Sequence, residues 1–227
     1  MNTWMTFFLA SLCATAALGQ QPVKEAPVFH GRKVAFTMHW KGAAWLTRTS
    51  REREEAASEM VTALKIKPGM NICDMGCGNG FHTLTMAKLT GEAGKIYAVD
   101  IQQEMLDFLE QRRKEAKIQD GIIVPILGGE NDPRLPENSI DLLLMVDVYH
   151  EFWEPEAMLA HIRKSLKPGG RVALVEYREE DTTVPIKPDH KMSKMQIMKE
   201  YTASGFKLVE SYDKLPWQHL MFFERQD

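Results

Sequence analysis

The pattern of apolar and polar positions changes along the chain, from helical spacing before Pro68-Gly69 to short alternating runs after it. The stretch from Arg51 to Leu64 carries apolar residues at helical spacing, which predicts one helix, and the run RERE at 51–54 is predicted to be its solvated face. Pro68-Gly69 breaks the chain. Beyond this break, short apolar runs alternate with amphipathic segments. The predicted strands are 71–75, 96–99, 122–127, 140–146, 172–177, 206–212 and 220–224, and the predicted helices run from the Gly-rich turn to 89, over 102–116, from Pro155 to the KPGG stretch at 167–170, and over 193–204.

The order of these elements predicts the fold class. The run IDLLLMV at 140–146 is almost wholly apolar, as expected for a strand that is covered on both faces. Strands that alternate with helices form a parallel sheet with helices on both sides. The sequence therefore predicts a doubly wound, Rossmann-like α/β domain.

Composition and charge exclude several classes of protein. The chain has 227 residues, 44% of them hydrophobic and 26% charged, and its formal net charge is -3. This is the composition of a globular domain, too apolar for a disordered chain. The near-neutral balance lacks the basic excess of proteins that bind nucleic acids or anionic membranes, so neither is an expected partner.

The N-terminal stretch differs from the rest. Residues 5–18 are apolar and uncharged but too short for a bilayer span, and small residues occur near Gly19, which predicts a signal peptide at 1–19. Export, for example to the periplasm, is the expected location, with no stable membrane span after cleavage. Because no Lys or Arg precedes the apolar stretch, a cytoplasmic or membrane-anchored protein stays as the alternative. Residues 20–47 are expected to form a cap or lid, and 48–227 the main domain.

The residues that follow the first two predicted strands carry the chemistry. The segment DMGCGNG at 74–80 places glycines at alternate positions, where the backbone can approach a ligand closely. Phe81 stands where a dinucleotide fingerprint needs its third glycine, which argues against an NAD-dependent dehydrogenase. Asp100 ends the second strand, where an acid can accept both hydroxyls of a ribose. Cys73, in the first strand, is expected to be a buried apolar side chain.

These segments resemble the class I S-adenosylmethionine-dependent methyltransferases, in particular the small-molecule branch that includes quinone-biosynthesis enzymes. The similar segments are DMGCGNG at 74–80, YAVD at 97–100, LPENSIDLLLMVD at 135–147 and LKPGGRVALVEY at 166–177. The resemblance covers the chain from about Arg48 to the C-terminus. It implies S-adenosylmethionine as the cofactor and a last strand that runs antiparallel.

The resemblance also implies a cofactor site, residue by residue. Its members are Gly76, Gly78 and Gly80 around the amino-acid part, Asp74 in support of that loop, Asp100 at the ribose, Ile101 or Gln102 against the adenine, Asn131 or Asp132 facing the adenine amine, and Asp147 at the end of the fourth-strand segment.

The methyl acceptor is expected at the ends of the fourth and fifth strands. His150 is the first choice for a general base because its ordinary pKa lies near neutrality, and His190 or His219 are the alternatives. Arg178 could hold an anionic acceptor and Tyr149 could form an aromatic wall. His150, Glu151, His190 and His219 could together bind a metal ion, but no compact motif such as H-E-x-x-H links them, so no metal site is predicted.

The sequence thus predicts methyl transfer from S-adenosylmethionine to a small molecule. The rival hypothesis is an exported Rossmann-like binding module without methyltransferase activity. The sequence does not distinguish oxygen, nitrogen, sulfur and carbon as the methylated atom, and it does not indicate the oligomeric state.

The location hypotheses predict different mature chains. If the predicted signal peptide is cleaved, mass spectrometry of the natively expressed protein will find Gln20 as the first residue. An intact Met1 or Asn2 would contradict cleavage.

Overall fold

The computed structural model describes residues 25–226. The predicted signal peptide at 1–19 and the first residues of the expected lid, 20–24, lie outside the described residues. Among the residues described, no helix combines the length and the apolar character that a membrane crossing requires.

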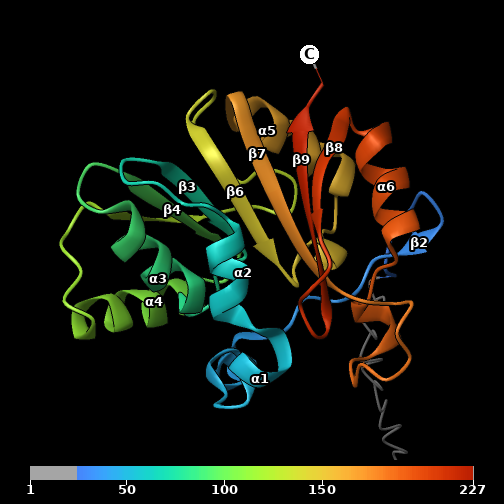
Figure 1. The fold of residues 1–227 in the computed structure, drawn as a ribbon, viewed down its shortest axis with the longest axis horizontal. Coiled ribbons are helices and arrows are strands. Elements are labelled where there is room, and N and C mark those ends of the chain that lie inside the picture. Colours follow the sequence, from blue (N-terminus) through green and yellow to red (C-terminus); the bar gives the residue numbers. More distant parts are fainter. Residues whose placement is uncertain (1–24, 227) are drawn as a thin grey trace, which may run out of the picture.

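The centre of the domain is a seven-stranded sheet with the order β5-β4-β3-β6-β7-β9-β8. Neighbouring strands from β5 to β7 are parallel, and β9 is antiparallel to both β7 and β8. Helices flank both faces (Figure 1), so the predicted doubly wound sheet with an antiparallel last strand is confirmed. The strands are β3 Asn71–Met75, β4 Lys95–Asp100, β5 Ile123–Leu127, β6 Ile140–Val146, β7 Leu166–Tyr177, β8 Phe206–Tyr212 and β9 Gln218–Arg225.

Most of the predicted helices are present with small shifts of their ends. The exception is the single helix predicted over 51–64, which is wrong. Ala56 adopts a left-handed φ of 49°, and this residue separates α1 from α2. The turn lets α1 lie beyond the edge of the sheet while α2 packs on its face (Figure 1). The α-helices are α1 Arg51–Glu55, α2 Ala57–Ala63, α3 Phe81–Thr90, α4 Gln103–Glu115, α5 Pro155–Ser165 and α6 Lys194–Ala203.

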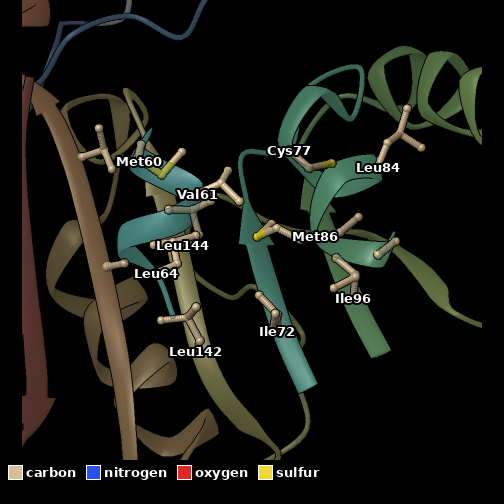
Figure 2. Close-up of a cluster of buried hydrophobic side chains, with 14 of the residues drawn as sticks. Met60, Val61, Leu64, Ile72, Cys77, Leu84, Met86, Ile96, Leu142 and Leu144 are labelled. Carbon is tan, nitrogen blue, oxygen red and sulfur yellow. The ribbon is translucent and has the colours of Figure 1, made fainter. Parts of the chain in front are cut away.

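Two apolar cores lie on the two faces of the sheet because side chains along a strand alternate between the faces. In β6, Leu142 and Leu144 belong to the core under α2, α3 and α4. Leu143 and Met145 belong to the other core, under α5 and α6. Figure 2 shows side chains of α2 lying against Leu142 and Leu144. Cys73 of β3 is fully buried in the second core, as predicted.

The segment before α1 runs across the end of the sheet. It contains a two-residue hairpin, β1 Val28–Phe29 with β2 Arg32–Lys33, and a 3₁₀ helix, η1 Trp40–Thr47. Backbone hydrogen bonds fix its path, because Ala35 donates its N–H to the carbonyl oxygen of His150 at 3.0 Å. Two more 3₁₀ turns, η2 Tyr149–Glu151 and η3 Pro188–His190, follow β6 and β7.

The parallel register brings several strand ends to one edge. Met75 of β3 lies opposite Val99 of β4 and Met145 of β6. The residues that leave these strands therefore emerge side by side, at the edge to which the arrowhead of β6 points in Figure 1 and near which α1 lies. Ligand sites of doubly wound sheets form at this edge.

The core under α2 predicts a matched pair of stability effects. Leu144→Ala removes a fully buried side chain and should lower the free energy of unfolding by about 2–5 kcal/mol. Leu89→Ala removes the same atoms from a side chain that is 45% exposed and should cost less than about 1 kcal/mol. Urea titration followed by circular dichroism measures both. Equal losses would contradict this placement of the core.

Candidate functional site

A cavity of about 420 Å³ opens at the carboxyl edge of the sheet. Its wall combines residues from the strand ends, from the segment before α1, from α1 and from the loop that follows β7. The lining residues used below are Met38, Leu46, Arg48, Arg51, Glu55, Gly76, Gly78, Asp100, Ile101, Gln102, Asp147, Val148, His150, Glu151, Tyr177, Lys187 and His190.

The turn after β3 forms one side of the cavity. Gly76 and Gly78 have φ values of 67° and 52°, in the left-handed region that favours glycine. The amides of Gly76 and Cys77 both donate to the carbonyl oxygen of Val99, at 2.8 and 3.0 Å. A Cβ on Gly76 would lie 2.3 Å from Cγ2 of Val148. Position 76 therefore requires glycine, both because of its positive φ and because a Cβ there would overlap Val148.

Two of the predicted cofactor residues support this turn and do not line the cavity. Gly80, with φ 81°, precedes the first turn of α3, where a Cβ would lie 2.2 Å from Cδ1 of Leu109. The carboxylate of Asp74 is buried and accepts the hydroxyl hydrogen of Thr83. Burial raises the pKa of Asp74 to about 6.

Asp100 holds the turn from the neighbouring strand. One carboxylate oxygen accepts the Gly78 N–H and the other accepts the Gln102 N–H, each at 2.9 Å. Burial raises the pKa of Asp100 above its ordinary value. Each carboxylate oxygen has a second lone pair. Since Asp100 also lines the cavity, its carboxylate can accept two further hydroxyl hydrogens there.

Gln102 joins this side of the cavity to the segment before α1. Its side-chain oxygen accepts the Trp40 N–H at 2.8 Å, and its side-chain nitrogen donates to the Met38 carbonyl at 3.0 Å. Asn79 donates in the same way to the carbonyl of Ala43 at 3.0 Å. Ile101, which is 43% exposed, also lines the cavity.

Asn131 and Asp132, predicted to face the adenine, do not line the cavity. Their loop is closed by its own hydrogen bonds: the Asp132 carbonyl accepts the Gly129 N–H at 2.8 Å, and its side chain accepts the Arg134 N–H at 2.7 Å. These contacts hold Asp132 within the loop.

Asp147 lies where β6 ends and does line the cavity. It adopts a left-handed φ of 53°, and one carboxylate oxygen accepts the side-chain N–H of Gln218 at 2.7 Å. Burial, together with the charges of Glu55 and Glu176, raises the pKa of Asp147 well above its ordinary value.

A buried ion-pair cluster on the cavity wall was not predicted. Glu55 accepts hydrogen bonds from Arg48, from Arg51 at 2.6 Å and from the Tyr177 hydroxyl at 2.9 Å. Only 5% of Arg51 is exposed, so the prediction that it belongs to a solvated face is wrong. The charge of Arg51 is buried because Glu55 neutralises it and the Leu46 carbonyl accepts a second hydrogen bond. The signal in the sequence was the i,i+4 spacing of Arg51 and Glu55, which places both on one helical face.

His150 and His190 are in contact in another part of the cavity wall. The Nδ1 atom of His150 lies 2.7 Å from a carboxylate oxygen of Glu176, and its Nε2 lies 2.9 Å from Nδ1 of His190. Burial alone would lower the pKa of His150, but the charge and hydrogen bond of Glu176 outweigh it and raise the pKa. Burial and the charge of His150 lower the pKa of His190. Burial raises the pKa of Glu151, the next residue in the wall, to about 7.

The other three predicted acceptor residues do not line the cavity. Tyr149 is fully buried in the second core and donates its hydroxyl hydrogen to Glu200 at 2.7 Å. Arg178 donates to backbone carbonyls, among them that of Leu215 at 2.6 Å. His219 pairs with Glu180 at 2.8 Å. Each of these side chains already has a partner away from the cavity.

Comparisons with known proteins agree with this architecture. Residues 66–221 match the family of methyltransferase domains. A SAM-dependent methyltransferase from Aquifex aeolicus superimposes with a TM-score of 0.76 at 22% identity, covering 82% of this chain and 98% of that one. Magnesium protoporphyrin IX methyltransferase from Synechocystis, solved with bound SAM, has a TM-score of 0.52 at 19% identity and covers 82% of this chain and 77% of its own.

The alignments with curated sequence relatives cover only part of each chain. The ubiquinone/menaquinone biosynthesis C-methyltransferase UbiE of Burkholderia cenocepacia is 29% identical over 52% of this chain and 47% of its own length. An uncharacterised transposon protein of Streptomyces fradiae is 32% identical over 60% of this chain and 38% of its own. The chain thus spans less than half the length of these curated relatives. It belongs to the methyltransferase-domain family, in the class I group whose cofactor is S-adenosylmethionine.

The hydrogen bonds of Gln102 predict how the segment before α1 is held. Gln102→Ala removes both contacts, each contributing about 1 kcal/mol, so trypsin should cleave after the exposed Lys41 at least about fivefold faster. Gln103→Ala is the matched control, because Gln103 is exposed and bonds only within α4, to Asp107. Equal cleavage rates in the two variants would contradict this role of Gln102.

Proposed function

We propose that this chain binds S-adenosylmethionine in the cavity at the carboxyl edge of its sheet and transfers the methyl group to a small molecule. The observation that carries the proposal is the arrangement of Asp100, whose buried carboxylate holds the glycine turn through Gly78 and still faces the cavity. A paired acid and glycine turn at this edge suits a ligand with a ribose and a flexible charged arm.

Different residues of the cavity wall would contact different parts of the cofactor. Asp100 would accept the ribose hydroxyls, and Ile101 would lie against the adenine. Gly76 and Gly78 would let the backbone approach the methionine part, since no side chain projects from them into the cavity. The volume of about 420 Å³ is within the range of small-molecule sites.

The acceptor would occupy the part of the cavity near His150, Glu151 and Lys187. The segment before α1 supports a small acceptor, because Met38 and Leu46 of this segment form part of the cavity wall. The overall charge of -3 also gives no general attraction for a nucleic acid.

The reaction needs little from the protein beyond orientation. The bound cofactor supplies a methyl group on a positively charged sulfur, which leaves as a neutral thioether. The chain holds the acceptor in line with that methyl group and excludes water, and positioning of this kind accounts for a large part of such rate enhancements. Asp147 and Tyr177 would form the floor between the two ligands.

Binding of the cofactor is tested by calorimetry with S-adenosylmethionine, its demethylated product and NAD. Wild type should bind the first two and not NAD. Asp100→Asn should weaken binding at least about tenfold, because a hydrogen bond to a charged group contributes about 1.5–3 kcal/mol. Asp107→Asn, in an exposed residue of α4, is the control and should bind as wild type does. No binding by folded wild type would favour the non-catalytic binding module instead.

The acceptor class is tested with radiolabelled S-adenosylmethionine and an extract separated by size. Label that appears only in the low-mass fraction, and only with active protein, supports a small-molecule acceptor. Label in protein or RNA would contradict it.

A further inference from the structure

Three side chains of the cavity wall bring potential ligand atoms within 4.8 Å of one another. Nε2 of His150 lies 2.9 Å from Nδ1 of His190, and Oε1 of Glu151 lies 3.9 and 3.6 Å from these two atoms. His150 and Glu151 belong to η2, after β6, while His190 ends η3, after β7. Among the described residues, this is the one group of His, Cys, Asp and Glu side chains whose spacing suits a metal ion.

The three distances fit the size of an ion. A point in the plane of the three atoms and equally far from each lies about 2.0 Å from all of them, which is the length of a Zn–N or Zn–O bond. The three atoms can therefore bind one ion without movement of the backbone. A histidine pair that served only to connect two loops would not need the Glu151 oxygen at the same point.

Glu176 orients the first of these ligands. It is fully buried at the end of β7, and because a carboxylate accepts, the Nδ1 atom of His150 donates to it at 2.7 Å. The lone pair of His150 is therefore on Nε2, which is one of the three potential ligand atoms. A carboxylate behind a histidine is the usual second-layer partner of a metal ligand. Glu151 is held as well, since its Oε1 accepts the Met38 N–H at 3.2 Å.

The same atom would be used by a general base, and the geometry favours the ion. Both roles need the lone pair of Nε2 in His150. In the structure Nδ1 of His190 lies 2.9 Å from this atom, so Nε2 of His150 already has a close partner. A bound ion instead uses His150 and His190 together and explains why Glu151 is beside them.

We propose that His150, Glu151 and His190 bind a Zn²⁺ ion, with Glu176 as the positioning residue behind His150. Two imidazoles and one carboxylate form a set that zinc uses when a coordination position is left open, whereas Mg²⁺ prefers oxygen ligands alone. The side chain of His190 is 23% exposed and all three ligands line the cavity, so the open position faces the cavity.

The open position suggests the chemistry of the acceptor. A hydroxyl group of the acceptor would coordinate the ion there, which lowers its pKa. Its proton would pass to water in the open cavity, its oxygen would form the new bond to the methyl carbon, and the S–CH3 bond of the cofactor would break. This role of the ion rests on the proposed methyl transfer, whereas binding of the ion itself does not.

The test is a metal titration of the full chain, freed of any affinity tag and treated with a chelator. Co²⁺ is the probe, because it absorbs visible light in a zinc-like site. We expect one Co²⁺ per chain, a visible absorption band, and loss of that band when Zn²⁺ is added.

Variants identify the ligands. Glu151→Gln and His190→Gln should abolish the band or weaken binding at least about 100-fold, and Glu176→Gln should weaken it about 10- to 100-fold. The control is His161→Gln, a surface histidine whose Nδ1 lies 3.7 Å from Asp132, and it should bind as wild type does. Thermal unfolding of the metal-free variants checks that they fold.

The outcomes separate the ion site from the methyl transfer. Absence of the band in wild type, or equal affinity in the Glu151 and His190 variants, would overturn the ion site even if S-adenosylmethionine binds. Conversely, metal binding that depends on these residues supports the site even if calorimetry finds no cofactor binding, an outcome that would overturn the proposed function alone.

Discussion

The parallel register of β3 with both of its neighbours is the constraint on which the site depends. Met75 lies opposite Val99 and Met145, so the chain leaves three adjacent strands at one level. The carbonyl oxygen of Val99 can then accept two amides of the glycine turn, and Asp100 can reach Gly78. A shift of one residue between these strands would turn every side chain to the other face and separate the acid from the turn.

The cavity wall around His150 arises from the next pair of strands by the same rule. Val146 of β6 lies opposite Val175 of β7, so Glu176 emerges beside the residues that follow β6. This placement buries a carboxylate directly behind His150. A buried carboxylate is stable only with donors around it, and His150 supplies them through its ring and its backbone amide. The orientation of His150, and with it the proposed ion site, follows from sheet register.

The segment before α1 connects the two sides of the cavity. Gln102 holds it on the side of Asp100, and Glu151 holds the Met38 amide on the side of His150. Movement of this segment would therefore change both sides of the cavity at once. Arg51 of α1 also belongs to the cavity wall, and Glu55 balances its buried charge. The segment before α1 is thus held by polar contacts, which can open more easily than the contacts of an apolar core.

The sequence by itself determined the order of strands and helices, the glycine turn and the acid that follows the second strand, because these features depend on local periodicity and on backbone torsions. Side-chain direction at the strand ends was decided only by tertiary structure. Tyr149 turns into the core toward Glu200, while its neighbour His150 faces the cavity and meets His190, forty residues further along the chain. Arg51 and Glu55 are four residues apart in α1, but Tyr177, which completes their buried cluster, comes from β7. Long-range hydrogen bonds and burial select among such orientations, and neither leaves a periodic signal in the sequence.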